Sequence, residues 1–161
     1  MGYVGSEPVM QLVDCIYSAA YGTGDWTAVM RELRGLFGGA RACIAAFGTS
    51  DLSAVSHETD DDPQFISPQF LGAYRRDPLA IAEQAMEVGR TYSWNEIVDS
   101  RELRSRALWQ DIYQPMGLHE SISCKLYENA HSAVCVHVTR TQAQPEFDGA
   151  DKQLFSRIVP H

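Results

Sequence analysis

Hydrophobic and polar positions follow two different periods along this chain, and the changes of period predict the order of its elements. Apolar side chains recur every three or four residues from Val9 to Ala20, from Trp26 to Phe37 and from Leu154 to Val159. That spacing is typical of helices with one buried face. Asp25 precedes the second of these segments and can cap its N-terminus. The chain therefore begins with two helices and ends with a third.

Other segments show the pattern of strands. Ala42–Phe47 is a short continuous apolar run, which indicates a buried strand, and Ser53–Glu58 is a weaker candidate that a tight turn would join to it. Glu120–Tyr127 and Ser132–Arg140 alternate between apolar and polar residues, and the turn residues 129–131 lie between them. Strands joined by tight turns favour antiparallel pairing.

The sequence pattern in the middle of the chain predicts shorter helices and strands. A helix is expected from Ser67 to Tyr74, a second from Asp77-Pro78 to Val88, and a third from Asp99 to the residue before Pro115. Residues 91–94 can form a short strand. Helices on both sides of an antiparallel sheet give the α+β class, as a three-layer α-β-α sandwich.

Composition narrows the function classes. The chain has 161 residues, enough for one domain, and its formal net charge is −8. A protein that binds nucleic acid alone needs a basic surface, so this segment is not expected to hold DNA by itself. No apolar stretch is long enough to cross a membrane and no secretory signal is visible, so we expect a cytoplasmic protein. The four cysteines lie in apolar patterns and none form C-x-x-C, which indicates reduced, buried thiols.

The sequence contains few candidate catalytic or metal-binding motifs. The sequence has no nucleophile elbow, zinc-protease motif or phosphate-binding glycine loop, so we expect no enzyme and no catalytic residue. Asp60, Asp61 and Asp62 could hold a divalent metal or form a solvated loop; the spacing of a calcium loop is missing. The histidines lack the spacing of a metal site, and neither a metal nor a cofactor is expected. Cys135 and His137 lie two apart on one strand, so a dyad on one face is geometrically possible.

Four short segments carry a resemblance to a known family. They read Tyr74-Arg75-Arg76-Asp77-Pro78, Tyr92-Ser93-Trp94, Ser105-Arg106-Ala107-Leu108-Trp109 and Met116-Gly117-Leu118-His119-Glu120-Ser121-Ile122-Ser123. In this order and spacing they resemble the N-terminal ligand-sensing domain of LuxR-type bacterial transcription regulators. The resemblance implies a PAS- or GAF-like sandwich around a five-stranded antiparallel sheet. Residues 1–161 would then be one sensor domain, and the family's helix-turn-helix domain, its only contact with DNA, would follow residue 161.

The resemblance also implies a site. In the family's sensors a small ligand lies between the sheet and one helical layer. Asp77 matches the aspartate that accepts a hydrogen bond from the ligand amide, and Trp94 matches a tryptophan of the pocket wall. Trp109 and Ser123 fall at an aromatic and a small hydroxyl position of the same pocket, and Tyr74 is expected to line it. Each residue could instead have a purely structural role. Asp77 could only cap a helix, both tryptophans could belong to the hydrophobic core, and the Ser123 hydroxyl could make its hydrogen bonds within the sheet.

One segment departs from the family pattern. Where the lactone sensors carry a tryptophan and a tyrosine, residues 57–65 offer acids instead of aromatics. A lactone carbonyl needs a donor, whereas an ionised aspartate only accepts. The expected function is therefore a sensory or dimerisation domain, a homodimer whose ligand is a small, largely apolar molecule other than a standard acyl-homoserine lactone. The alternative is a protein-interaction or dimerisation module that binds no ligand.

Overall fold

The computed structural model describes residues 6–50, 54–59 and 72–161. Helices and strands follow one another in the order α1 (Ser6–Ala20), α2 (Trp26–Leu36), β1 (Arg41–Gly48), β2 (Ala54–Thr59), α4 (Pro78–Gln84), β3 (Thr91–Ser93), α5 (Trp94–Ile97), α6 (Ser100–Arg104), the π-helical segment η2 (Trp109–Tyr113), β4 (Leu118–Glu128), β5 (Ser132–Thr141) and α7 (Gly149–Ile158).

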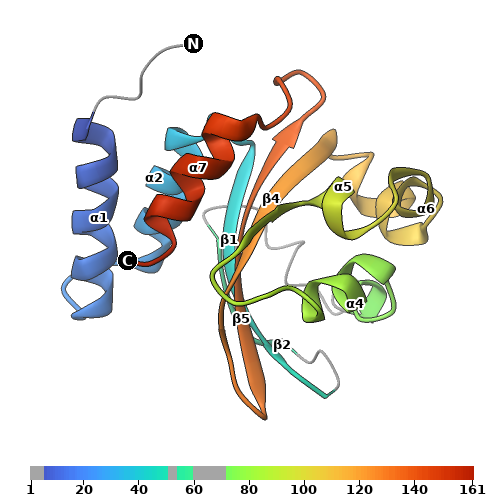
Figure 1. Ribbon diagram of the computed structural model, residues 1–161, viewed down its shortest axis with the longest axis horizontal. Helices are drawn as coiled ribbons and strands as arrows, with labels where there is room; N and C mark the ends of the chain where they lie inside the picture. The colour runs from blue at the N-terminus through green and yellow to red at the C-terminus, as the bar shows by residue number, and fades with distance from the viewer. Residues whose placement is uncertain (1–5, 51–53, 60–71) are drawn as a thin grey trace.

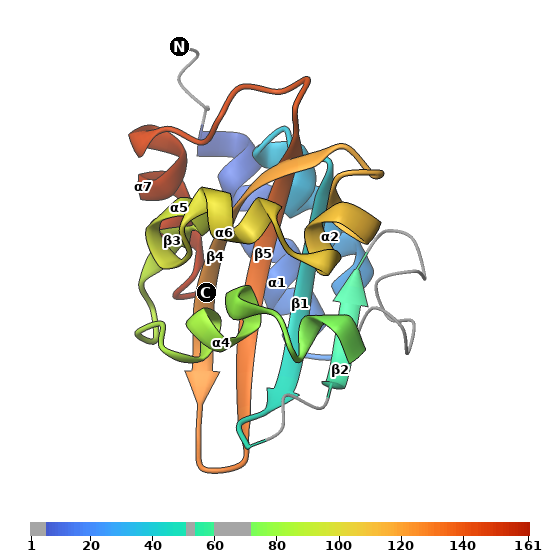
Figure 2. The same ribbon diagram turned by 90° about the vertical axis from the view of Figure 1, so that its right-hand side faces the viewer.

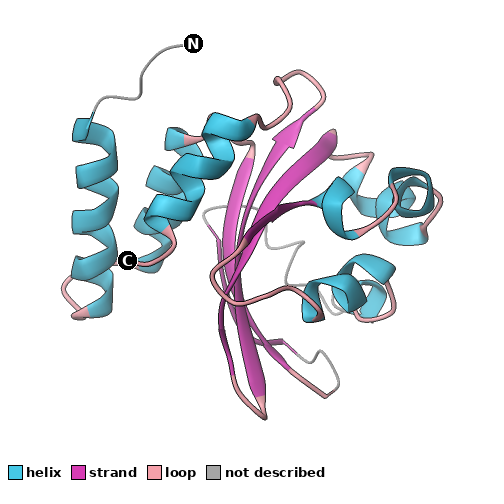
Figure 3. Cartoon of the chain, viewed as in Figure 1, coloured by secondary structure: helices cyan, strands magenta, loops and turns pink. Residues whose placement is uncertain are grey.

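The strands form one antiparallel sheet in the order β2-β1-β5-β4-β3. Four of them are six to eleven residues long, and β3, at one edge, has three residues. Helices α1, α2 and α7 cover one face of the sheet, and α4, α5 and α6 cover the other (Figures 1 and 3). The expected α+β class with a central antiparallel sheet is confirmed.

The two faces of the sheet differ in chemistry because alternate residues of each strand point to opposite sides. Ile122 of β4 pairs with Val138 of β5, and both belong to the apolar core beneath α1, α2 and α7. The neighbouring pairs, Ser121 with Thr139 and Ser123 with His137, lie on the other side. The face that meets α4 and α5 is thus a row of buried polar groups.

Side-chain caps fix where several helices begin. Asp25 accepts a hydrogen bond from the backbone of Thr27 at the start of α2, as the sequence predicts. Asp99 and Asp148 cap α6 and α7 in the same way. Asp77 caps α4, and Pro78 takes the first helical position, where its missing N–H costs no hydrogen bond.

Three expected elements differ in the structure. Helix α4 ends at Gln84, before the expected Val88. The helix expected from Asp99 onward stops at Arg104, where the hydroxyl of Ser105 donates to a carbonyl of the last turn, and a separate π-helical segment follows. Trp94 begins helix α5 instead of ending a strand, because the Glu96 carboxylate accepts the backbone N–H of residue 93 at 2.7 Å.

Some expectations lie outside the described residues. They are the acidic loop at residues 60–62 and most of the helix expected from residue 67 to residue 74. Among the residues that the structure describes, no helix is long and apolar enough to span a membrane. The same part of the chain holds no cluster of three or more side chains that could ligate a metal.

Candidate functional site

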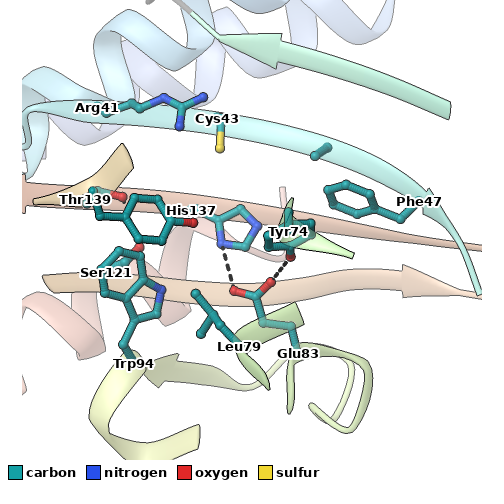
Figure 4. Close-up of a pocket in the computed structure, with 12 residues that line it drawn as sticks. Arg41, Cys43, Phe47, Tyr74, Leu79, Glu83, Trp94, Ser121, His137 and Thr139 are labelled. Atoms are coloured by element: carbon teal, nitrogen blue, oxygen red, sulfur yellow. Dashed lines mark hydrogen bonds and ion pairs between the residues drawn. The ribbon is translucent and has the colours of Figure 1, made fainter. Parts of the chain in front are cut away.

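A cavity of about 50 Å³ lies between the polar face of the sheet and the helices that cover it. Figure 2 views the molecule from this side, with α4, α5 and α6 in front of the strands. Strands β1, β4 and β5 form the floor, and α4, α5 and η2 contribute the roof. The lining residues are Arg41, Cys43, Ala45, Phe47, Tyr74, Leu79, Glu83, Trp94, Tyr113, Ser121, His137 and Thr139 (Figure 4).

Glu83 is the central polar residue of this cavity. Its side chain is 5% exposed and approaches the sheet from α4. The hydroxyl of Tyr74 donates a hydrogen bond to one carboxylate oxygen, and Nδ1 of His137 lies 3.6 Å from the other (Figure 4). A carboxyl group thus stands among aromatic and aliphatic walls with partners on two sides.

Burial changes the ionisation of this group. Removal from water raises the pKa of Glu83 from its ordinary value to about 7, and the hydrogen bond from Tyr74 opposes part of that rise. The pKa of the Tyr74 phenol is raised well above its usual value, first by burial and then by the negative charge of Glu83. Near neutral pH, Glu83 can therefore either accept a hydrogen bond as a carboxylate or donate one as an acid.

A second, adjoining cavity has a volume of about 120 Å³. Phe47, Tyr74 and Glu83 line both spaces. The rings of Phe47 and Tyr74 pack with their centroids 5.4 Å apart. These two rings and the carboxyl of Glu83 therefore lie where the two cavities adjoin.

The structure brings two of the five predicted site residues to the cavity wall. These are Tyr74 and Trp94, both buried. Asp77 is buried behind them and accepts a hydrogen bond from the N–H of residue 79 at 2.9 Å, as a helix cap. Trp109 packs against Trp94 with ring centroids 6.1 Å apart, and Ser123 shares a 2.8 Å hydrogen bond with Nδ1 of His137. Each of these three residues contacts a residue or helix of the wall, and their part in binding stays a prediction.

Sequence reasoning missed most of the polar lining. The alternation along the strands could have identified two of these residues, because it places Ser121 on the same face as Ser123 and Thr139 on the same face as His137. Glu83 follows Leu79 by four residues, and that spacing puts it on the buried stripe of α4. A charged residue is seldom buried, which is why the spacing alone did not single it out.

The arrangement gives little support for catalysis. Ser123, His137 and Glu83 resemble the members of a hydrolytic triad, but the serine and the carboxylate both approach Nδ1 of the histidine. A triad needs one imidazole nitrogen for the nucleophile and the other for the acid. A dyad of Cys135 and His137 is disfavoured, because burial first, and then the charge of Glu83, raise the pKa of the Cys135 thiol and so oppose formation of the thiolate.

Comparisons with known proteins bear on the fold. No family model matches the sequence, and no curated protein is significantly similar to it. The crystal structure of the VqsR LBD domain from Pseudomonas aeruginosa matches with a TM-score of 0.68 at 16% identity, over 99% of this chain and 92% of that one. The chain shares the fold of that domain. Escherichia coli SdiA matches with a TM-score of 0.55 at 15% identity, over 81% of this chain and 57% of SdiA.

Proposed function

We propose that this chain is the ligand-sensing and dimerisation domain of a LuxR-type bacterial transcription regulator. The two structural neighbours named above are LuxR-family domains, and four segments of the sequence also resemble this family. DNA would be contacted only by a helix-turn-helix domain that follows residue 161, since this segment carries a formal net charge of −8. Such a regulator would act in the cytoplasm.

The observation that carries the proposal is the cavity between the polar face of the sheet and α4. Buried polar groups cost free energy unless they are paired, so a protein core seldom gathers a carboxyl, an imidazole and several hydroxyls on one wall. Glu83, His137, Ser121 and Thr139 provide such a wall here. Apolar and aromatic side chains surround it, and a few convergent polar groups in an apolar cavity are typical of small-molecule sites.

The lining indicates the chemistry of the ligand. Phe47, Leu79, Trp94 and Tyr113 would contact an apolar body. Glu83 would accept a hydrogen bond from a hydroxyl, amine or amide of the ligand in place of the bond from Tyr74. We propose a small, largely apolar molecule with one such donor, other than a standard acyl-homoserine lactone. It would occupy both cavities after the rings of residues 47 and 74 move apart.

Native mass spectrometry of the purified protein, with denaturing mass spectrometry beside it, tests the proposal. A ligand-binding sensor should show a native mass above that of the chain and should release a small molecule on denaturation. The Glu83→Gln variant should lose that molecule, whereas Glu87→Gln, whose side chain is 72% exposed just beyond the same helix, should keep it. An identical bound mass in both variants would place the ligand elsewhere.

A second candidate function is a dimerisation or protein-interaction module without a ligand. It is favoured by the volume of the first cavity, about 50 Å³, which holds only a few water molecules, whereas ligand pockets usually measure ~300–1,000 Å³. An apo protein from several expression hosts that also shows no thermal shift with small hydroxyl, amine and amide compounds would support this module over the sensor.

Under either function we propose that α1 contributes to self-association. Met10 and Tyr17 on α1 and Tyr21 just after it are large apolar or aromatic side chains that are 57%, 45% and 81% exposed. Tyr21→Glu should raise the dissociation constant of a homodimer in sedimentation equilibrium. Tyr127→Glu, at an exposed tyrosine of β4, is the matched control and should leave it unchanged.

A further inference from the structure

A larger cavity lies on the opposite face of the sheet from the candidate site. Its volume is about 260 Å³. The strands supply its floor through Ile44 and Val136, and the helices supply its walls through Leu12 and Ile16 of α1, Val29 of α2 and Phe155 of α7. Helices α1, α2 and α7 all lie on this side of the sheet (Figure 1). Three helices from the two ends of the chain therefore surround it together with the strands.

This volume is too large for an ordinary defect in packing. Protein interiors are packed about as densely as organic crystals, and the voids that remain are seldom larger than a water molecule. The walls named above are hydrocarbon, so water inside would lack the two to four polar partners that it needs. An enclosed apolar cavity of ~150 Å³ stays dry and binds benzene; this cavity is also apolar, and it is open to solvent, so a ligand can enter. An apolar molecule is the occupant that suits it.

One polar side chain of the cavity wall lies near a second polar group. His161 lines the cavity, and its Nδ1 lies 3.4 Å from the hydroxyl of Tyr17. Both side chains are exposed. A ligand could bury a hydrocarbon chain between the helices and leave one polar end among these groups and water. A neutral hydroxyl can form hydrogen bonds with the Tyr17 hydroxyl and the His161 imidazole, and the net charge of −8 disfavours an acidic head.

We propose that this cavity is a second binding site, for a small hydrocarbon-chain molecule with one uncharged polar end, such as a medium-chain alcohol. The site is separate from the one described above because the sheet lies between them: Val136 lines this cavity, and its neighbour His137 lines the other. The inference goes beyond the proposed sensor function and does not depend on it.

Two valines of β5 provide a matched test. Val136 and Val138 point to the same face of the same strand and are both buried, but only Val136 lines the cavity. Val138 has no free space beside it, because its Cγ1 packs directly against the backbone of Gly39. A Cβ atom added at Gly39 would lie only 2.6 Å from that Cγ1. Val136→Phe should fill space that is empty and raise the melting temperature of the ligand-free protein. Val138→Phe should overpack the core and lower it.

The probe is octan-1-ol, with octane-1,8-diol as its control. We expect octan-1-ol to raise the melting temperature of the wild-type protein and of Glu83→Gln equally, and to bind Val136→Phe at least tenfold more weakly. The diol should bind less well because one hydroxyl must be buried without a partner. An absent shift in the wild type, or an equal shift in Val136→Phe, would overturn the proposal.

A measurement on the wild type alone guards against a variant that fails to fold. Nuclear Overhauser effects should connect the alkyl protons of octan-1-ol with the methyl groups of Val29 and Val136. Effects to Leu79 instead would place the alcohol in the candidate site on the other face, and would overturn the second site while leaving the proposed sensor function intact.

Discussion

The hydroxyl of Tyr74 donates a hydrogen bond to the carboxyl of Glu83, and both side chains are buried at the boundary between two cavities. The Tyr74 ring also packs against Phe47, with ring centroids 5.4 Å apart. Under the proposed function, a ligand that offers its own donor to Glu83 would replace the bond from Tyr74. This contact therefore joins a buried acid to an aromatic ring that lines both cavities.

Replacement of Tyr74 by Phe removes the donor and keeps the ring. The free energy of unfolding should fall by about 1–3 kcal/mol, which is the usual result of leaving a buried polar group without its partner. The pKa of Glu83 should rise further, because the hydrogen bond from Tyr74 lowers it in the wild type. Urea denaturation at pH 5 and pH 8 measures both effects, and the loss should be larger at pH 8.

Tyr127→Phe is the control for this change. Its hydroxyl accepts a hydrogen bond from Asn129, but the side chain is 52% exposed, so water can replace that bond. The variant should stay within about 0.5 kcal/mol of the wild type at both pH values. Equal losses in the two variants would mean that the Tyr74–Glu83 contact has no special importance.

Glu83 should make stability depend on pH. Its pKa is about 7 in the folded protein against an ordinary value of 4.5, so between these values the folded state binds more protons than the unfolded state. Stability must then fall as the pH rises through this window, by about 3 kcal/mol in total if the full difference is realised. Below pH 4.5 the group is protonated in both states and contributes no slope.

Glu83→Gln isolates this contribution, because the amide cannot ionise. Urea denaturation between pH 4 and pH 8.5 should give similar stabilities of variant and wild type at the acidic end and a more stable variant at the basic end. The ionisable neighbours Arg41, Asp77 and His137 remain in both proteins, so the difference between the two curves reports Glu83 together with its coupling to them. Parallel curves would show that the pKa of Glu83 is not raised.

Asp77 can be tested for a role beyond capping. Its carboxylate accepts the N–H of Leu79, as that of Asp25 accepts the N–H of Thr27 at the start of a helix remote from the candidate site. Asp77→Ala and Asp25→Ala should each lower the free energy of unfolding by about 1 kcal/mol.

Measurements of ligand binding then distinguish the role of Asp77 from that of Asp25. If Asp77 contacts ligand, Asp77→Ala should weaken binding of the molecule recovered from the purified protein by more than Asp25→Ala does. Isothermal titration calorimetry on both variants measures this. Equal affinities in the two would reduce Asp77 to a helix cap, which is the simpler of the two roles that its sequence position allows.

Periodicity predicted the layers well because it reflects burial on one face. The alternating pattern of Glu120–Tyr127 and Ser132–Arg140 corresponds to β4 and β5, and the turn between them is where it was expected. Helices α1, α2 and α7 likewise follow from apolar spacing. Such long elements bury enough surface to override local detail.

The site itself was less predictable, because it depends on contacts between distant segments. Glu83 meets His137 across 54 positions of the chain, and no local spacing encodes that meeting. The short elements were mispredicted for a different reason. Helix α5 starts where the Glu96 carboxylate accepts the backbone N–H of Ser93, and α6 ends where the Ser105 hydroxyl donates to a backbone carbonyl. A periodic pattern of apolar residues does not register such bonds.

Arg140 joins the C-terminal end of α2 to the loop before α7. Its Nε and Nη2 donate to the carbonyl of Phe37 at 3.1 and 2.6 Å, and its Nη1 lies 2.8 Å from the Asp151 carboxylate. The guanidinium also lies over the ring of Phe147, 3.9 Å from its centroid. An ammonium group cannot reproduce this planar, forked set of contacts. Arg140→Lys should therefore lower the free energy of unfolding by about 2 kcal/mol or more.

Hydrogen exchange should locate that loss. Amides of α7 should exchange faster in Arg140→Lys, because the helix loses its connection to α2, while amides of β4 should change only as far as global stability falls. Arg157→Lys, at an exposed position on α7, should alter neither unfolding nor exchange. If both variants behaved like the wild type, the other contacts of α7, such as those of Phe155 and Ile158, would be enough to hold it.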